Sequence, residues 1–286
     1  MYSVELIWRW SFMVCALCKE EKGTLIDSHF MPAAAYQHVR GTEETGNGPP
    51  VLISLRRKSA IQTDKQIKRP LLCSDCEDLF SKKGERMMGQ LWATASGFPL
   101  LDLLNSKATI SKGERFDMYD GRLLDAGVVS SIFYFAMSIF WRAQVWDWGY
   151  EEDPYKRALG EHYESKFRKF LLGRETLDNV LLFVNVNSDS DTTAVMTFPL
   201  SGRSGADRLH TFSLLGFKFT MYVGRSISSA TRAPFEIHKT QIMFVSSDLK
   251  KSASFQKLAV RVQLEVEAKG KLKTSSANKF NHSQRP

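Results

Sequence analysis

The cysteines of this chain have the spacing of metal ligands. All four of them, among 286 residues, fall into two C-x-x-C pairs, Cys15 with Cys18 and Cys73 with Cys76. Two intervening residues let one tight turn present both sulfurs to a single ion, so two turns supply four soft ligands. We therefore predict a closed, tetrahedral, structural zinc site. The alternatives are four unrelated buried thiols or two redox dithiols, but the sequence indicates no pair of βαβ units in which redox dithiols would begin helices.

Between the two pairs lies a segment that predicts a strand carrying a histidine. It runs from Leu25 to Pro32 and contains His29 near its end. Asp27 stands two residues before His29, so both side chains share a face of an extended strand. Glu77 follows the second cysteine pair directly, at the start of a helical pattern.

This order of motifs resembles the zinc-bearing branch of the HNH (His-Me finger) endonucleases, over roughly residues 12–90. In that family a strand that ends in a histidine lies between two C-x-x-C pairs, and the second pair opens a helix that supplies a metal ligand. The resemblance implies that His29 is the base that activates water and that Asp27 and Glu77 are candidate ligands of a catalytic Mg²⁺ or Mn²⁺. It implies hydrolysis of phosphodiester bonds, in restriction or phage defence by analogy with the family.

Two positions depart from the family's pattern. The family usually has an acid or a histidine directly before the base, where this chain has Ser28, and often a histidine or asparagine where it has Glu77. A second hypothesis is therefore a catalytically inactive, zinc-stabilised protein that binds nucleic acid or serves as a scaffold. Glu85 is a weaker candidate for a metal ligand, and His38 is expected to be structural.

The charge of the chain favours an anionic partner. The net charge is +8 and the sequence pI is about 9.3, which points to nucleic acid before a membrane surface. The partner that we expect is DNA rather than RNA. Residues 41–70 read as an insertion between the cysteine pairs, and its second half holds six cations against Asp64 alone. We expect these cations to contact phosphates, with a solvated loop as the equally weighted alternative. They are Arg56, Arg57, Lys58, Lys65, Lys68 and Arg69.

The whole pattern predicts an α+β fold in three parts. Residues 1–95 form the zinc-stabilised ββα-metal (HNH-like) module, 96–268 an α+β domain that binds substrate or a protein partner, and 269–286 a basic tail that we expect to be disordered. The apolar segment 127–148 nearly reaches the length of a membrane span. Arg142 and two serines interrupt it, so we expect a central buried helix whose arginine finds a carboxylate or carbonyl partner.

After residue 176 the pattern predicts strands. Residues 180–186 are β-rich and are followed by a turn, so we expect 193–198 to be their hairpin partner. Further strands are expected in 209–223 and 241–245, forming a small antiparallel sheet on the buried helix, and a closing helix in 252–267.

The cysteines also indicate a compartment. Four cysteines used as zinc ligands favour a reducing environment, so we expect a cytoplasmic protein with no membrane partner. Residues 1–14 lack the basic start and the cleavage site of a signal peptide. A third hypothesis, membrane association through 127–148, remains as the alternative.

Overall fold

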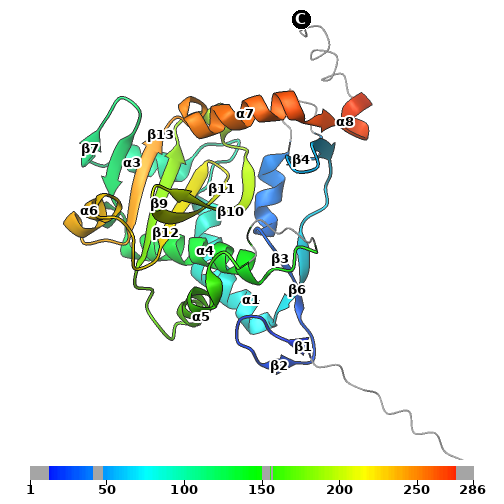
Figure 1. The fold of residues 1–286 in the computed structure, drawn as a ribbon, viewed down its shortest axis with the longest axis horizontal. Helices are drawn as coiled ribbons and strands as arrows, with labels where there is room; N and C mark the ends of the chain where they lie inside the picture. The colour runs from blue at the N-terminus through cyan, green and yellow to red at the C-terminus, as the bar shows by residue number, and fades with distance from the viewer. Residues whose placement is uncertain (1–12, 41–47, 150–154, 156, 275–286) are drawn as a thin grey trace, which may run out of the picture.

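The computed structural model describes residues 13–40, 48–149, 155 and 157–274, and has the predicted α+β composition (Figure 1). A β-rich N-terminal part leads into a run of helices, which pack on a seven-stranded sheet. The residues that the sequence analysis singled out for chemistry lie in the N-terminal part.

Short strands build the N-terminal part. Two pairings hold it together, β1 with β2 and β3 with β6, and both are antiparallel. Between β3 and β6 come a 3₁₀ helix and the hairpin β4–β5, so the predicted insertion contains a hairpin. The elements are β1 (Met13–Val14), β2 (Glu21–Lys22), β3 (Ile26–His29), η1 (Ala33–Val39), β4 (Val51–Ser54), β5 (Ser59–Gln62) and β6 (Lys68–Leu72).

A continuous helical segment follows the second cysteine pair. It consists of α1 (Ser74–Phe80), a π-helical turn η2 (Ser81–Glu85) and α2 (Arg86–Leu91), and it packs on α4 (Ala126–Val145). A Cβ on Gly84 would lie 3.0 Å from the Cα of Phe135. The absence of a side chain at Gly84 therefore permits the close approach of the two helices.

Helix α4 is the predicted buried helix. Among the described residues it is the one helix long and apolar enough to cross a membrane, and 61% of its apolar window is buried inside the protein. The Arg142 guanidinium is buried and pairs with the Glu85 carboxylate (Nη2–Oε1 2.6 Å), and it also donates to the carbonyl of Phe30 (3.3 Å). The expectation of a carboxylate and carbonyl partner is confirmed.

The sheet has the strand order β10-β11-β12-β9-β13-β8-β7. All its pairings are antiparallel except β9 with β13, so the expectation of a purely antiparallel sheet is wrong at that pair. The strands are β7 (Ser111–Lys112), β8 (Asp117–Asp120), β9 (Val180–Asn187), β10 (Met196–Ser204), β11 (Asp207–Leu214), β12 (Phe217–Val223) and β13 (Ile242–Ser247).

The predicted hairpin between residues 180–186 and 193–198 does not form. Strand β9 lies between β12 and β13, whereas β10 pairs with β11 at the edge of the sheet. Strand β9 is buried along almost its whole length. A strand in that position needs hydrogen-bonding neighbours on both edges, and two strands from later in the chain supply them.

The remaining elements lie around the sheet and helix α4. They are α3 (Pro99–Asn105), η3 (Gly121–Leu123), α5 (Gly160–Leu171), η4 (Ser190–Thr192), α6 (Ser229–Ile237), η5 (Leu249–Lys251), α7 (Ala253–Glu265), β14 (Glu267–Ala268) and α8 (Lys271–Thr274). Helix α7 confirms the predicted closing helix. The expectation of disorder from residue 269 is wrong for the first residues of the tail, because Lys269 donates to the carbonyl of Ala60 (2.8 Å) and α8 follows. Residues 275–286 lie outside the described part.

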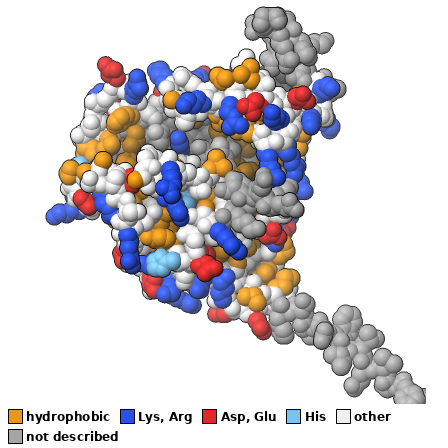
Figure 2. Space-filling view, in the orientation of Figure 1, with side chains coloured by type: hydrophobic (Ala, Val, Ile, Leu, Met, Phe, Trp, Pro, Cys, Tyr) orange, Lys and Arg blue, Asp and Glu red, His pale blue; other side chains and the backbone are white. Residues whose placement is uncertain are grey.

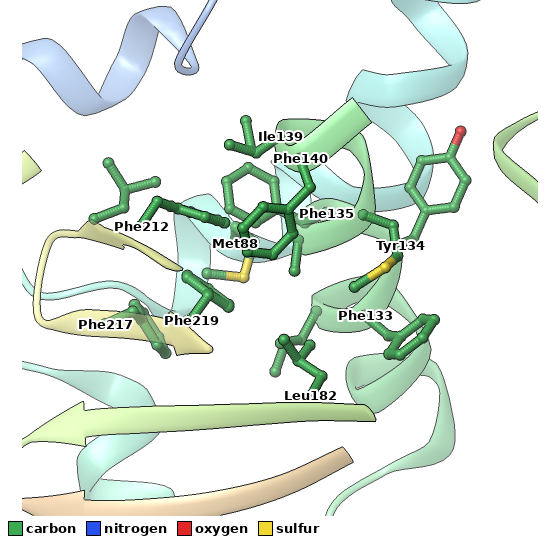
Figure 3. Close-up of a cluster of buried hydrophobic side chains, with 14 of the residues drawn as sticks. Met88, Phe133, Tyr134, Phe135, Ile139, Phe140, Leu182, Phe212, Phe217 and Phe219 are labelled. Carbon is green, nitrogen blue, oxygen red and sulfur yellow. The ribbon is translucent and has the colours of Figure 1, made fainter. Parts of the chain in front are cut away.

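The core joins the helices to the sheet. Figure 3 shows Phe135 and Phe140 of α4 facing Phe212 and Phe219 of the sheet, with Met88 of α2 beside them. The rings of Phe140 and Phe212 meet edge to face at 5.0 Å between centroids. One cluster of buried residues runs from Cys15 to Phe244, so no break in the core marks the expected boundary at residue 95.

Candidate metal centre and adjoining histidine

The four cysteines meet at one point. Cys15 and Cys18 lie in the turn between β1 and β2, Cys73 follows β6, and Cys76 lies in the first turn of α1. All four Sγ atoms lie within 4.8 Å of one another, and those of Cys18 and Cys73 are 3.9 Å apart. Zinc–sulfur bonds of about 2.3 Å in a tetrahedron place sulfurs about 3.8 Å apart. The cluster therefore fits a structural metal ion such as zinc.

Backbone hydrogen bonds shape the first turn around its sulfurs. The amide of Lys19 donates to the carbonyl of Cys15 (3.0 Å), and Lys19 takes a φ of +64° to close the turn. The amide of Ala16 donates to the carbonyl of Leu71, which fixes the turn against β6. The amide of Cys73 points at the Sγ of Cys15 (3.3 Å), an interaction that favours a thiolate there.

The thiols of the cluster differ in how readily they lose their protons. A hydrogen bond from Cys76 is the largest influence on the Cys15 thiol and lowers its pKa to about 4. The same hydrogen bond, together with burial, raises the pKa of Cys76. All four cysteines are free of disulfides. Four thiolates so close together repel one another, so full deprotonation requires a positive ion at the centre.

Strand β3 presents alternate residues to opposite sides. Ser28 is fully buried, and its hydroxyl donates to the Glu77 carboxylate on α1 (Oγ–Oε2 2.8 Å). His29 is the next residue and is partly exposed. The structure thus joins Ser28 of β3 to Glu77, the residue after Cys76, whereas alternation along the strand directs His29 to the other side.

Asp27 lies on the other face of β3 from Ser28. Its carboxylate pairs with the ammonium of Lys68 on β6 (2.7 Å), and both side chains are about half exposed. Alternation along the strand puts Asp27 on the face of His29, but the structure does not group it with Glu77. Within the described residues, the four cysteines are the one gathering of three or more metal-binding side chains.

The two weaker candidates have other partners. Glu85 is the carboxylate that neutralises buried Arg142, which accounts for its position without a metal. The ring of His38 lies 6.0 Å from that of Trp92, and its Nε2 lies 3.1 Å from the Gln37 amide. Both contacts agree with a structural role for His38.

The six cations of the insertion do not form one group: some are exposed in loops, and others are paired with carboxylates. Arg56, Arg57 and Lys58 are exposed in the turn of the hairpin β4–β5, and Lys65 is exposed in the loop that follows. Lys68 is paired with Asp27, as described above. The Arg69 guanidinium pairs with the Asp147 carboxylate at 3.2 Å and lies over the Trp146 ring.

An aromatic cluster beside the histidine was missed by the sequence analysis. The Phe30 ring, directly after His29, contacts Trp146 and Trp148 at centroid distances of 5.1 and 4.8 Å, and Phe198 at 5.4 Å. Trp148 and Phe198 are only partly buried. The Trp-x-Trp spacing after α4 is the signal that could have indicated this cluster.

Comparisons with protein-family models, with curated proteins and with solved structures give no match. The functional interpretation therefore depends on the geometry of these residues.

Proposed function

We propose that this chain is a metal-dependent HNH-type endonuclease that hydrolyses phosphodiester bonds in nucleic acid, with DNA favoured over RNA. The observation that carries the proposal is the four-cysteine cluster, with all Sγ atoms within 4.8 Å, which ties the helix that carries Glu77 to β6, the strand that pairs with the one carrying His29. In this proposal the cysteines bind zinc, and the protein is cytoplasmic, because the reducing cytoplasm keeps cysteines from forming disulfides.

The cysteine cluster supports the proposal through its position. Cys73 is the residue between β6 and α1, Cys76 lies in the first turn of α1, and β6 pairs with β3 through the register His29 to Lys68. An ion bound there would fix the helix that carries Glu77 relative to the strand that carries His29. Such rigidity is what a catalytic site requires, because small displacements of its groups reduce the rate strongly.

Each side chain has a distinct role in the proposed reaction. The His29 imidazole accepts a proton from water, the water oxygen bonds to phosphorus, and one P–O bond breaks with its electron pair leaving on oxygen. Of the two candidate ligands, Asp27 and Glu77, the Glu77 carboxylate is the hard oxygen donor that would help to hold Mg²⁺ or Mn²⁺ with water and a phosphate oxygen, because Asp27 is paired with Lys68. A divalent ion there would stabilise the charge that develops on the phosphate.

A second candidate function is an inactive, zinc-stabilised protein that binds nucleic acid. The observation that favours it is the pairing of Asp27 with Lys68 on the far face of β3. That pairing leaves Glu77 as the one carboxylate bonded to Ser28. A single carboxylate gives a divalent ion fewer protein ligands than the resemblance implied.

A cleavage assay separates the two functions. We expect wild-type protein to cut plasmid or single-stranded DNA with Mg²⁺ or Mn²⁺, and His29→Ala to lose at least about 100-fold in rate, because general-base catalysis contributes that much. His38→Ala is the matched control and should cut at the wild-type rate. Cleavage that survives His29→Ala would contradict the proposed base. Binding with a steep salt dependence but no cleavage by any variant would favour the second function.

A further inference from the structure

The C-terminal segment and the insertion hairpin form one structural unit. Strand β14 pairs in parallel with β5, in the register Glu267 to Ser59 and Ala268 to Ala60. The amide of Glu267 donates to the carbonyl of Lys58 (3.0 Å), and the amide of Lys269 donates to that of Ala60 (2.8 Å). Two cationic segments that are far apart in the sequence are thereby fixed side by side.

This unit presents a surface with a large excess of positive charge. Among the described residues of the hairpin turn and of the segment from α7 to α8 there are eight exposed cations and two acids, Glu265 and Glu267, and Glu265 is paired with Arg261 (3.2 Å). Figure 2 shows blue side chains gathered at the upper right, over the region where Figure 1 places β4, α7 and α8. The cations of this surface, which we call the composite basic surface, are Arg56, Arg57, Lys58, Lys257, Arg261, Lys269, Lys271 and Lys273.

The C-terminal segment contributes little to the core. None of the residues of α7 is buried, and Leu264 is 78% exposed. Helix α8 is positioned by the backbone pairing of β14 with β5 rather than by apolar burial of α7. A segment that adds ordered cations but little buried apolar area is better suited to binding a ligand than to stabilising the fold.

We propose that the composite basic surface binds the phosphate backbone of duplex DNA without reading its sequence. Closely spaced lysines and arginines on an ordered surface neutralise successive phosphates and release their counterions. In Figure 1, β3 lies between this surface and the strands β1 and β2 that flank the cysteine cluster. The inference relies on the proposed function for the identity of the polyanion, and it assigns duplex binding to a surface separate from the site at His29.

The test compares two triple variants with equal loss of charge. Lys269→Gln, Lys271→Gln and Lys273→Gln remove three cations from the surface, whereas Lys112→Gln, Arg115→Gln and Lys239→Gln remove three exposed cations elsewhere. Both are made in the His29→Ala background without added divalent ions, so that DNA stays intact. Fluorescence anisotropy with a labelled duplex of about 20 base pairs, a length that spans several phosphate contacts, gives Kd at several KCl concentrations.

We expect the surface variant to bind at least about tenfold more weakly at low salt, with a log Kd–log salt slope shallower by about 2 to 3. The control should bind as the parent protein does. Equal weakening of both variants would show a general effect of net charge, and no weakening of either would remove the surface from the interface. Either result overturns the proposal.

Two further experiments identify the ligand and keep the test valid if the first triple variant misfolds. Arg56→Gln with Arg57→Gln removes cations from the other half of the surface and should weaken binding in the same way, even if the first triple variant folds poorly. Vesicles containing phosphatidylserine test a membrane partner, and a surface variant that loses only vesicle binding would overturn the proposal. Lost duplex binding in a chain that never cuts DNA would refute the proposed nuclease but not this surface.

Discussion

The cysteine cluster and the α4–sheet core hold the chain by different physical means. Strands β1 and β2 bury neither of their residues and β3 buries only Ser28, whereas all but two residues of β9 are buried. The sheet is held by apolar contacts such as those in Figure 3. Of the strands near the cysteines, β6 buries Leu71 and Leu72, but β1, β2 and β3 together bury one residue, so we infer that the order of these three strands depends on a bound metal.

The largest effect is expected from removing one metal ligand, which should disorder the region around the cysteines alone. Cys73→Ser should reduce bound zinc from about one per chain to none, since the free energy of a structural zinc site is of order 10 kcal/mol. Hydrogen exchange should become fast in β3 and β6 and stay slow in β9 and β12. Ser74→Ala, at the exposed neighbouring position, is the control. Unchanged protection of β3 in Cys73→Ser would show that the metal does not hold this region.

A smaller effect is expected where the two regions meet. Glu85→Ala leaves the Arg142 guanidinium buried without its carboxylate, and loss of one partner of a buried pair costs about 3–5 kcal/mol. Urea denaturation measures the free energy of unfolding. Removing Glu265 from its pair with Arg261 on the surface of α7 should cost at most about 1 kcal/mol. Equal effects of the two changes would contradict the structural role assigned to the buried pair.

The sequence analysis succeeded where the signal was local. The spacing of Cys15, Cys18, Cys73 and Cys76 predicted their meeting, and the apolar run around Arg142 predicted both the buried helix and its ion pair. The alternation along β3 did not show which face of the strand helix α1 would cover. Helix α1 covers the face of Ser28, so Glu77 bonds to Ser28, whereas Asp27 pairs with Lys68.

Pairings between distant segments could not be predicted. A β-rich pattern identifies β9 and β10 as strands but does not identify their neighbours. Strand β9 is buried inside the sheet and needs a hydrogen-bonding strand on each edge, and these are β12 and β13. Strand β14 has two residues and no pattern of its own. Its pairing with β5 creates the composite basic surface. This pairing depends on where helix α7 ends in the folded protein, which the sequence does not show.

The smallest expected effect is confined to the sheet. A hydrogen bond from Arg122 is the main cause that lowers the pKa of Asp120 to about 2, with His238 also donating to the carboxylate. A carboxyl with a depressed pKa stabilises the fold above its unfolded value of about 3.9, and this contribution disappears as the pH falls toward 2. Urea denaturation between those pH values should show wild type losing about 1–2 kcal/mol more than Asp120→Asn. Parallel pH profiles would contradict this assignment.

The most direct measurement of the central claim determines zinc content and DNA cleavage on the same preparations of wild type and His29→Ala. We predict about one zinc per chain in both proteins, with Mg²⁺-dependent cleavage in wild type alone, because the cysteines hold the site and the histidine performs the reaction. Cleavage at equal rates in both proteins, or full cleavage by protein that contains no zinc, would contradict the account.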